Sequence, residues 1–88
     1  MNIHVSNLSP RVEAIDLKKL FNPYGAVITI KIITDKFTNR SRGFGYIRMD
    51  DDEGAERAIL ELNGSKLNGR SMNIQKAIES DYEFHKNS

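Results

Sequence analysis

Alternating apolar and polar positions mark several short segments as strands of a half-buried sheet. Ile3-His4-Val5-Ser6 is the first, and further strands are expected at residues 27–33, 42–49 and 72–75. The segment at 27–33 is rich in β-branched residues, which favour strands. Its parity predicts that Ile30 and Ile32 face inward and that Lys31 faces outward.

Two other segments have the spacing i, i+3, i+4, i+7, which places apolar residues on one face of a helix. The two sets are Leu17, Leu20, Phe21 and Tyr24, and then Ala55, Ala58, Ile59 and Leu62. Pro23 and Gly25 are expected to end the first helix around Asn22. The acidic residues at 50–52 are expected to cap the second helix, and Asn-Gly pairs predict turns on either side of residues 65–67.

The predicted order is strand, helix, strand, strand, helix, strand, which indicates an α+β protein. Each helix has one apolar stripe and must pack on a sheet. We therefore expect a βαββαβ ferredoxin-like sandwich, with a four-stranded antiparallel sheet and two helices on one face. The domain is expected to span residues 1–77. Residues 78–88 form a tail that we expect to be flexible, although its Tyr82 and Phe84 could fold over the sheet.

The sheet face away from the helices, which we call the outer face, is where a function is expected. Strand parity assigns to it His4, Ser6, Lys31, Arg42, Phe44, Tyr46, Arg48, Asn73 and Gln75. Burying Phe44 would bury Arg42 and Arg48 with it, so the ring is expected to lie exposed as a stacking platform for a nucleobase. Tyr46 is expected to form a second platform. Gly43 and Gly45 lie on the opposite parity, where we expect them to allow close packing of a helix on the strand.

Charge along the chain supports a polyanionic ligand more than the net charge of +1 suggests. Residues 31–48 carry five basic side chains and one acidic one, whereas residues 50–61 carry six acidic and one basic. A nearly neutral protein can thus present one basic surface. Solvated charged faces would give the same pattern, so charge alone decides nothing.

Composition narrows the classes of function. The absence of cysteine excludes disulfides and thiolate metal sites. No signal-peptide pattern or membrane-spanning apolar run is present, so we expect a cytoplasmic protein, or an organellar or nuclear one if the source is eukaryotic. Small acyl-phosphate hydrolases share the predicted topology, but residues 7–11 do not look like their anion cradle. With only His4 and His85 as histidines and no paired carboxylates, we expect no catalysis, metal or other cofactor.

Two sequence motifs resemble the signatures of the RNA-recognition-motif family. Residues 42–49, RGFGYIRM, are similar to its octapeptide at seven places, with Met49 where an aromatic residue is usual. Residues 3–8, IHVSNL, resemble its hexapeptide, with His4 at a position that usually carries an aromatic ring. The likeness to the family extends from Ile3 to Ala77. The chain as a whole is also similar to small single-motif proteins of bacteria and plant organelles.

This resemblance implies that single-stranded RNA is the partner. Phe44 and Tyr46 would contact bases or sugars, His4 would occupy a stacking position, and Arg42 would pair with the RNA backbone. We further expect phosphate or other basic contacts from Lys31, Arg40 and Arg48, with Lys36 beside them in a loop that orders on binding. Base edges would be read by Ser6, Asn73, Gln75 and Lys76. His4 could instead be a surface strand residue without a role.

Two other ligands fit the same fold. Some members of the family bind peptides or partner subunits, but those that give up RNA tend to lose the stacking aromatics that this chain keeps. Single-stranded DNA is the second, because stacking and phosphate contacts do not read the 2′-hydroxyl.

Overall fold

The computed structural model describes residues 1–78. The predicted tail, with Tyr82 and Phe84, lies outside the described residues from position 79 on. The described elements are β1 (Asn2–Ser6), α1 (Ala14–Phe21), the 3-10 turn η1 (Asn22–Tyr24), β2 (Val27–Thr34), β3 (Ser41–Met49), α2 (Asp52–Leu62), β4 (Lys66–Leu67), β5 (Arg70–Ser71) and β6 (Asn73–Ala77).

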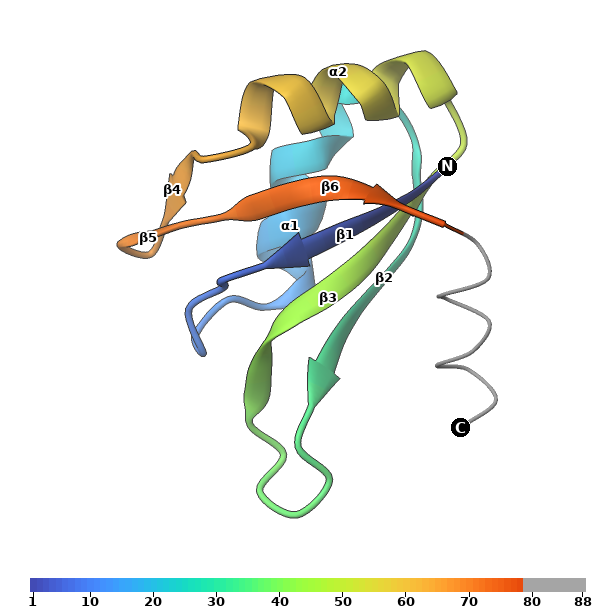
Figure 1. Cartoon of the computed structure of the whole chain (residues 1–88). Helices are drawn as coiled ribbons and strands as arrows, with labels where there is room; N and C mark the ends of the chain where they lie inside the picture. Colours follow the sequence, from blue (N-terminus) through green and yellow to red (C-terminus); the bar gives the residue numbers. More distant parts are fainter. Residues whose placement is uncertain (79–88) are drawn as a thin grey trace.

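The main sheet is antiparallel and has the strand order β2-β3-β1-β6. Both helices lie on the same side of this sheet (Figure 1). This arrangement confirms the predicted α+β sandwich. The chain also forms a small hairpin from β4 and β5, in the region that the two Asn-Gly turns marked.

The core lies between the sheet and the two helices. Strand parity separates the two faces of β1 cleanly, because Ile3 and Val5 are fully buried whereas His4 and Ser6 are only partly covered. The other core residues come from both layers and from the segment after β1: Leu8, Val12, Leu17, Phe21, Ile47, Met49, Ala55, Ala58, Leu62, Met72 and Ile74. Ile30 and Ile32 pack against this core from β2, and Lys31 is exposed, as predicted.

The turn after α1 differs from the expected continuous helical face. The helix ends at Phe21, and Pro23 lies in the following 3-10 turn, because its ring cannot continue the α-helical hydrogen bonding. Tyr24 packs against the core from this turn, and its hydroxyl donates to Glu61 in α2 at 3.0 Å. That hydrogen bond to a carboxylate raises the pKa of Tyr24 above its ordinary value.

The helix-packing role expected of Gly43 and Gly45 is wrong. A Cβ at Gly45 would lie 2.5 Å from the carbonyl oxygen of Lys31, so this glycine admits the neighbouring strand β2 and not a helix. Gly43 has φ +85°, and its carbonyl accepts from the amide of Leu8 at 2.8 Å, which indicates a bulged end of β3. The glycine that allows a close helix contact is Gly54 in α2, because a Cβ there would collide with the carbonyl oxygen of Tyr24 in η1.

Strand β2 pairs with β3 in an interrupted register. The register shifts between Val27 and Thr29, and again between Ile32 and Thr34. Regular pairing therefore covers only the middle of the strand. β2 forms one edge of the sheet that residues 1–78 build.

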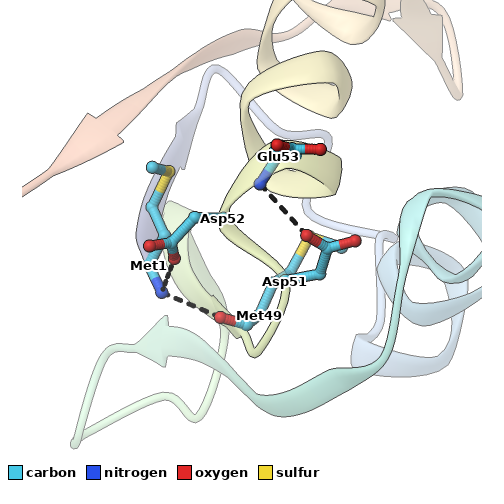
Figure 2. A network of polar contacts seen from close by, with 5 residues as sticks. All are labelled: Met1, Met49, Asp51, Asp52 and Glu53. Carbon is cyan, nitrogen blue, oxygen red and sulfur yellow. Dashed lines mark hydrogen bonds and ion pairs between the residues drawn. The ribbon is translucent and has the colours of Figure 1, made fainter.

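A polar network joins the start of β1 to the start of α2 (Figure 2). The amine of Met1 donates to the carbonyl oxygen of Met49 at 2.8 Å and lies 3.2 Å from a carboxylate oxygen of Asp52. The amide of Met49 donates back to Met1 at 3.0 Å. Asp51 caps the helix by accepting from the amide of Glu53 at 3.1 Å, as the acidic residues predicted. This network fixes the end of the β1–β3 pair against the helix.

Candidate functional site

Three ring side chains form a cluster at the centre of the outer face, with His4 on β1 and with Phe44 and Tyr46 on β3. In the register of β1 and β3, His4 lies opposite Tyr46, and Ser6 lies opposite Phe44. The ring centroid of His4 is 5.9 Å from that of Phe44 and 5.2 Å from that of Tyr46, and both pairs are tilted. His4 therefore connects the two aromatic rings, and the strand parity expected for all three is confirmed.

The two aromatic rings differ in how much of them solvent reaches. Tyr46 retains only 7% of its accessible surface, whereas Phe44 is half-buried. The expectation that both rings are exposed is therefore wrong for Tyr46. Parity predicts which face a side chain occupies but not how far its surroundings cover it.

Polar side chains on β6 flank this cluster of rings. Asn73 pairs with Ser6 and Gln75 pairs with His4 in the register of β1 and β6. Both are exposed. Their amides can donate and accept hydrogen bonds, which suits them to contact base edges next to a stacked ring.

A hollow of about 300 Å³ opens beside Phe44, at the end of β1 where the strand leaves the sheet. Ser6, Arg42 and Arg70 line it together with Phe44. Arg70 was not among the residues predicted from the sequence. The side chain of Asn7 explains its position, because this amide donates to the carbonyl oxygen of Ser71 at 2.7 Å and so holds the β4–β5 hairpin against the end of β1.

The remaining predicted basic residues are spread over the sheet. Lys31 is exposed opposite Tyr46, and Arg48 is exposed opposite Thr29 and Asn2. Arg40 lies in the loop between β2 and β3 and is also exposed. These side chains do not converge on one point, so they are suited to follow an extended ligand.

Lys76 was expected to contact base edges together with Gln75. The register places it opposite Ile3, whose side chain points into the core. Because directly opposite residues share a sheet face, Lys76 leaves the sheet on the helix side. It lines a second hollow of about 330 Å³ with Arg48 and Asp52. The acidic side chain in this hollow makes it a poorer anion site than the one beside Phe44.

The loop between β2 and β3 is held by one carboxylate. Asp35 accepts from the backbone amides of Phe37 at 2.8 Å and Thr38 at 3.1 Å. These hydrogen bonds hold the pKa of Asp35 below its usual range, and the positive charge of Arg42 lowers it further. The expected closure of the loop over a ligand stays a prediction.

Within residues 1–78, no group of His, Asp and Glu side chains is arranged to hold a metal ion. No helix of that part of the chain has the length and apolar character needed to cross a membrane.

Residues 3–73 match the family model described as RNA recognition motif. This chain belongs to the RNA recognition motif family. It is 42% identical over 77 residues to a putative RNA-binding protein, RbpD, of Nostoc sp., covering 88% of this chain and 82% of that protein. It is also 36% identical over 75 residues to the 29 kDa chloroplast ribonucleoprotein of Arabidopsis thaliana. That match covers 85% of this chain and 22% of the ribonucleoprotein.

Solved structures of RNA recognition motifs have the same fold. The crystal structure of RNA-binding protein PG1 is 47% identical, with a TM-score of 0.87 over 90% of this chain and 95% of that one. A Sxl-lethal protein/RNA complex is 31% identical, with a TM-score of 0.81 over 86% of this chain and 47% of that one. The family and the fold inferred from the two sequence motifs are thus confirmed.

Proposed function

We propose that this RNA recognition motif binds single-stranded RNA across the outer face. The observation that carries the proposal is the cluster of rings formed by Phe44, His4 and Tyr46, with exposed basic residues around it. The names of the Nostoc relative and of protein PG1 support it, as does the Sxl-lethal structure, which contains RNA.

Phe44 is the first stacking platform in this proposal. The Phe44 side chain is half-buried, so its position is fixed by its neighbours. Part of its ring faces the hollow lined by Ser6, Arg42 and Arg70. A nucleobase on this ring would lie next to two guanidinium groups, which suit the adjoining phosphates. Stacking of this kind contributes roughly 1–3 kcal/mol per base.

Tyr46 and His4, which face each other on neighbouring strands, would act together. Because Tyr46 is 7% exposed, a base that stacks on it must first displace atoms that cover the ring. We therefore expect Tyr46 to contribute less to affinity than Phe44. His4 lies on the neighbouring strand in contact with both rings and would support the adjacent base from the side.

Polar and basic groups complete the surface. Ser6, Asn73 and Gln75 would contact base edges, and Lys31, Arg40 and Arg48 would contact the RNA backbone. A single motif offers a small interface, so we expect affinity near roughly micromolar with loose sequence preference. Neutralising about three phosphates would give a slope of about −2 for log affinity against log salt.

The test is a titration of a labelled random single-stranded RNA pool, followed by fluorescence anisotropy. Wild-type protein is compared with Phe44→Ala, with the Phe44→Ala/Tyr46→Ala double variant, and with Leu60→Ala as the matched control. Leu60 is 83% exposed on α2, so its truncation removes a large apolar side chain from the helix side. Circular dichroism verifies that each variant is folded.

Saturable wild-type binding, weakened in Phe44→Ala and largely lost in the double variant but kept in Leu60→Ala, would support the proposal. Equal binding by all four proteins would contradict it, and so would no binding by the wild type at moderate salt. In that last case a protein ligand becomes the better explanation. Single-stranded DNA of matched sequence is titrated in parallel, and equal affinity for it would mean that the 2′-hydroxyl is not read.

A further inference from the structure

Phe37 is the most exposed large apolar residue among residues 1–78, with 87% of its surface accessible. It lies in the loop between β2 and β3, which projects beyond the end of the sheet (Figure 1). Single exposed apolar residues are common on protein surfaces, so exposure alone assigns no role. The construction of the loop and its charges provide the further observations.

The loop backbone holds Phe37 in one place. The carboxylate of Asp35 accepts from the amides of Phe37 and Thr38, and the carbonyl oxygen of Asp35 accepts from Asn39 at 2.7 Å. The amide of Asp35 donates to Arg40 at 2.8 Å, which closes the turn. Asn39 takes φ +60°, the left-handed conformation that asparagine tolerates in turns. A ring displayed by a preformed turn loses less conformational entropy when it binds a ligand.

The charges around this ring favour a nucleotide over an apolar protein surface. Lys36 is the adjacent residue, and Arg40 lies on the other side of the turn, both exposed. The one carboxylate of the loop, Asp35, is engaged by backbone amides and lies within the field of Arg42. An aromatic ring between exposed cations is the combination that binds a base together with its phosphates.

The loop also leads directly into the proposed RNA surface. β3 begins at Ser41, and Phe44 follows three residues later, a strand length of roughly 10 Å. Arg42 lies between them and lines the hollow beside Phe44. An RNA strand that leaves Phe44 towards this end of β3 would pass Arg42 and then reach the loop.

We propose that Phe37 stacks on a nucleobase outside the sheet, next to the nucleotides bound on the outer face, with Lys36 and Arg40 contacting the adjoining phosphates. This inference rests on the proposed function and extends its binding site by at least one nucleotide. Phe37 thereby determines how long an RNA must be for full affinity.

A fluorescence experiment tests the contact directly. The chain contains no tryptophan, so Phe37→Trp introduces a single reporter at the loop. Titration with single-stranded RNA of about eight nucleotides should quench its emission in parallel with binding seen by anisotropy, because a stacked base lies against the indole. Binding without any change in emission would overturn the proposal.

Affinity measurements then separate stacking from other contacts. Phe37→Ala should bind the longer RNA roughly tenfold more weakly than wild type. It should bind an oligonucleotide of about three nucleotides as wild type does, because that length is filled by the outer face. Phe37→Tyr should keep full affinity, whereas Phe37→Leu should lose nearly as much as Phe37→Ala.

The outcomes distinguish this proposal from the one it rests on. If wild type binds RNA and Phe44→Ala weakens it while Phe37→Ala does not, the loop contact is wrong and the sheet site stands. Full affinity of Phe37→Leu would also overturn stacking, since leucine has no aromatic face. If the wild-type protein binds neither the longer nor the shorter RNA, the proposed function itself is wrong. Leu60→Ala again serves as the matched control, because it removes an equally exposed apolar side chain from α2.

Discussion

The β1–β3 strand pair has two ends that are built differently. At one end, which we call the tied end, Met1, Met49 and Asp52 are joined by hydrogen bonds and an ion pair, and Gly54 packs against η1. At the other, the hollow end, Ser6, Arg42, Phe44 and Arg70 surround an accessible hollow. We therefore expect changes to the contacts of Met1, Asp52 and Gly54 to alter stability, and changes around the hollow beside Phe44 to alter RNA affinity.

The largest effect is expected for Gly54→Ala at the tied end. A methyl group there would collide with the carbonyl oxygen of Tyr24, so α2 and η1 must separate. We expect the free energy of unfolding to fall by about 3 kcal/mol, measured by urea denaturation. The folded fraction should bind RNA with wild-type affinity, as titrations corrected for unfolded protein would show.

Gly64→Ala is the matched control for this change. Nothing lies within 4 Å of a Cβ at Gly64, although its φ of +86° makes alanine unfavourable by about 1 kcal/mol. A similar loss of stability in both variants would mean that the collision with Tyr24 is relieved easily, and the tied end would not be specially constrained.

An intermediate effect is expected for Arg70→Gln at the hollow end. The change removes one charge from an exposed side chain, so stability should be nearly unchanged. RNA affinity should fall roughly threefold, and the slope of log affinity against log salt should become shallower by about 0.7. Anisotropy titrations at several salt concentrations measure both quantities.

Arg57→Gln supplies the control, because Arg57 is an exposed arginine of α2 on the helix side. An equal loss of affinity in both variants would show that net charge, and not the position of Arg70 beside Phe44, governs binding.

The smallest effect is expected for Asp52→Asn at the tied end. Its ion pair with the Met1 amine is open to solvent on the carboxylate side, since 73% of the Asp52 side chain is accessible, although only 6% of the Met1 side chain is. We expect the free energy of unfolding to fall by less than about 1 kcal/mol, and less at high salt. Urea denaturation is measured on protein whose first residue is Met1. Asp50→Asn is the control, because it removes the same charge nearby but leaves the Met1–Asp52 ion pair intact. RNA affinity should not change, and a clear loss of affinity would contradict the division between the two ends.

The layers of this fold could be predicted from the sequence because they follow from local periodicity. Alternation in residues 42–49 placed Phe44 and Tyr46 on the same face, and the register with β1 confirms it. The same pattern could not predict that Tyr46 is nearly buried, since coverage depends on neighbours that are distant in sequence. The alternation that puts Asn73 and Gln75 on the outer face puts Lys76 on the opposite one, as its pairing with Ile3 shows, so a base-edge contact from Lys76 stays a prediction.

Arg70 shows why part of the site was missed. It lies in a two-residue strand, too short for any periodic signal, and a side-chain hydrogen bond from Asn7 brings that hairpin to the hollow. Such a contact between residues far apart in the chain has no local trace. A basic residue directly after an Asn-Gly turn was the available clue, and it is a weak one.

The interrupted register of β2 has a consequence for how this protein behaves at high concentration. An edge strand as rich in isoleucine and valine as Val27–Thr34 is a template for pairing with another molecule, which leads to aggregation. The two register shifts leave regular pairing only at residues 29–32, and Lys31 lies within that stretch. Bulges increase local twist and a lysine resists apposition to its own copy, so both features oppose edge-to-edge association of neighbouring molecules.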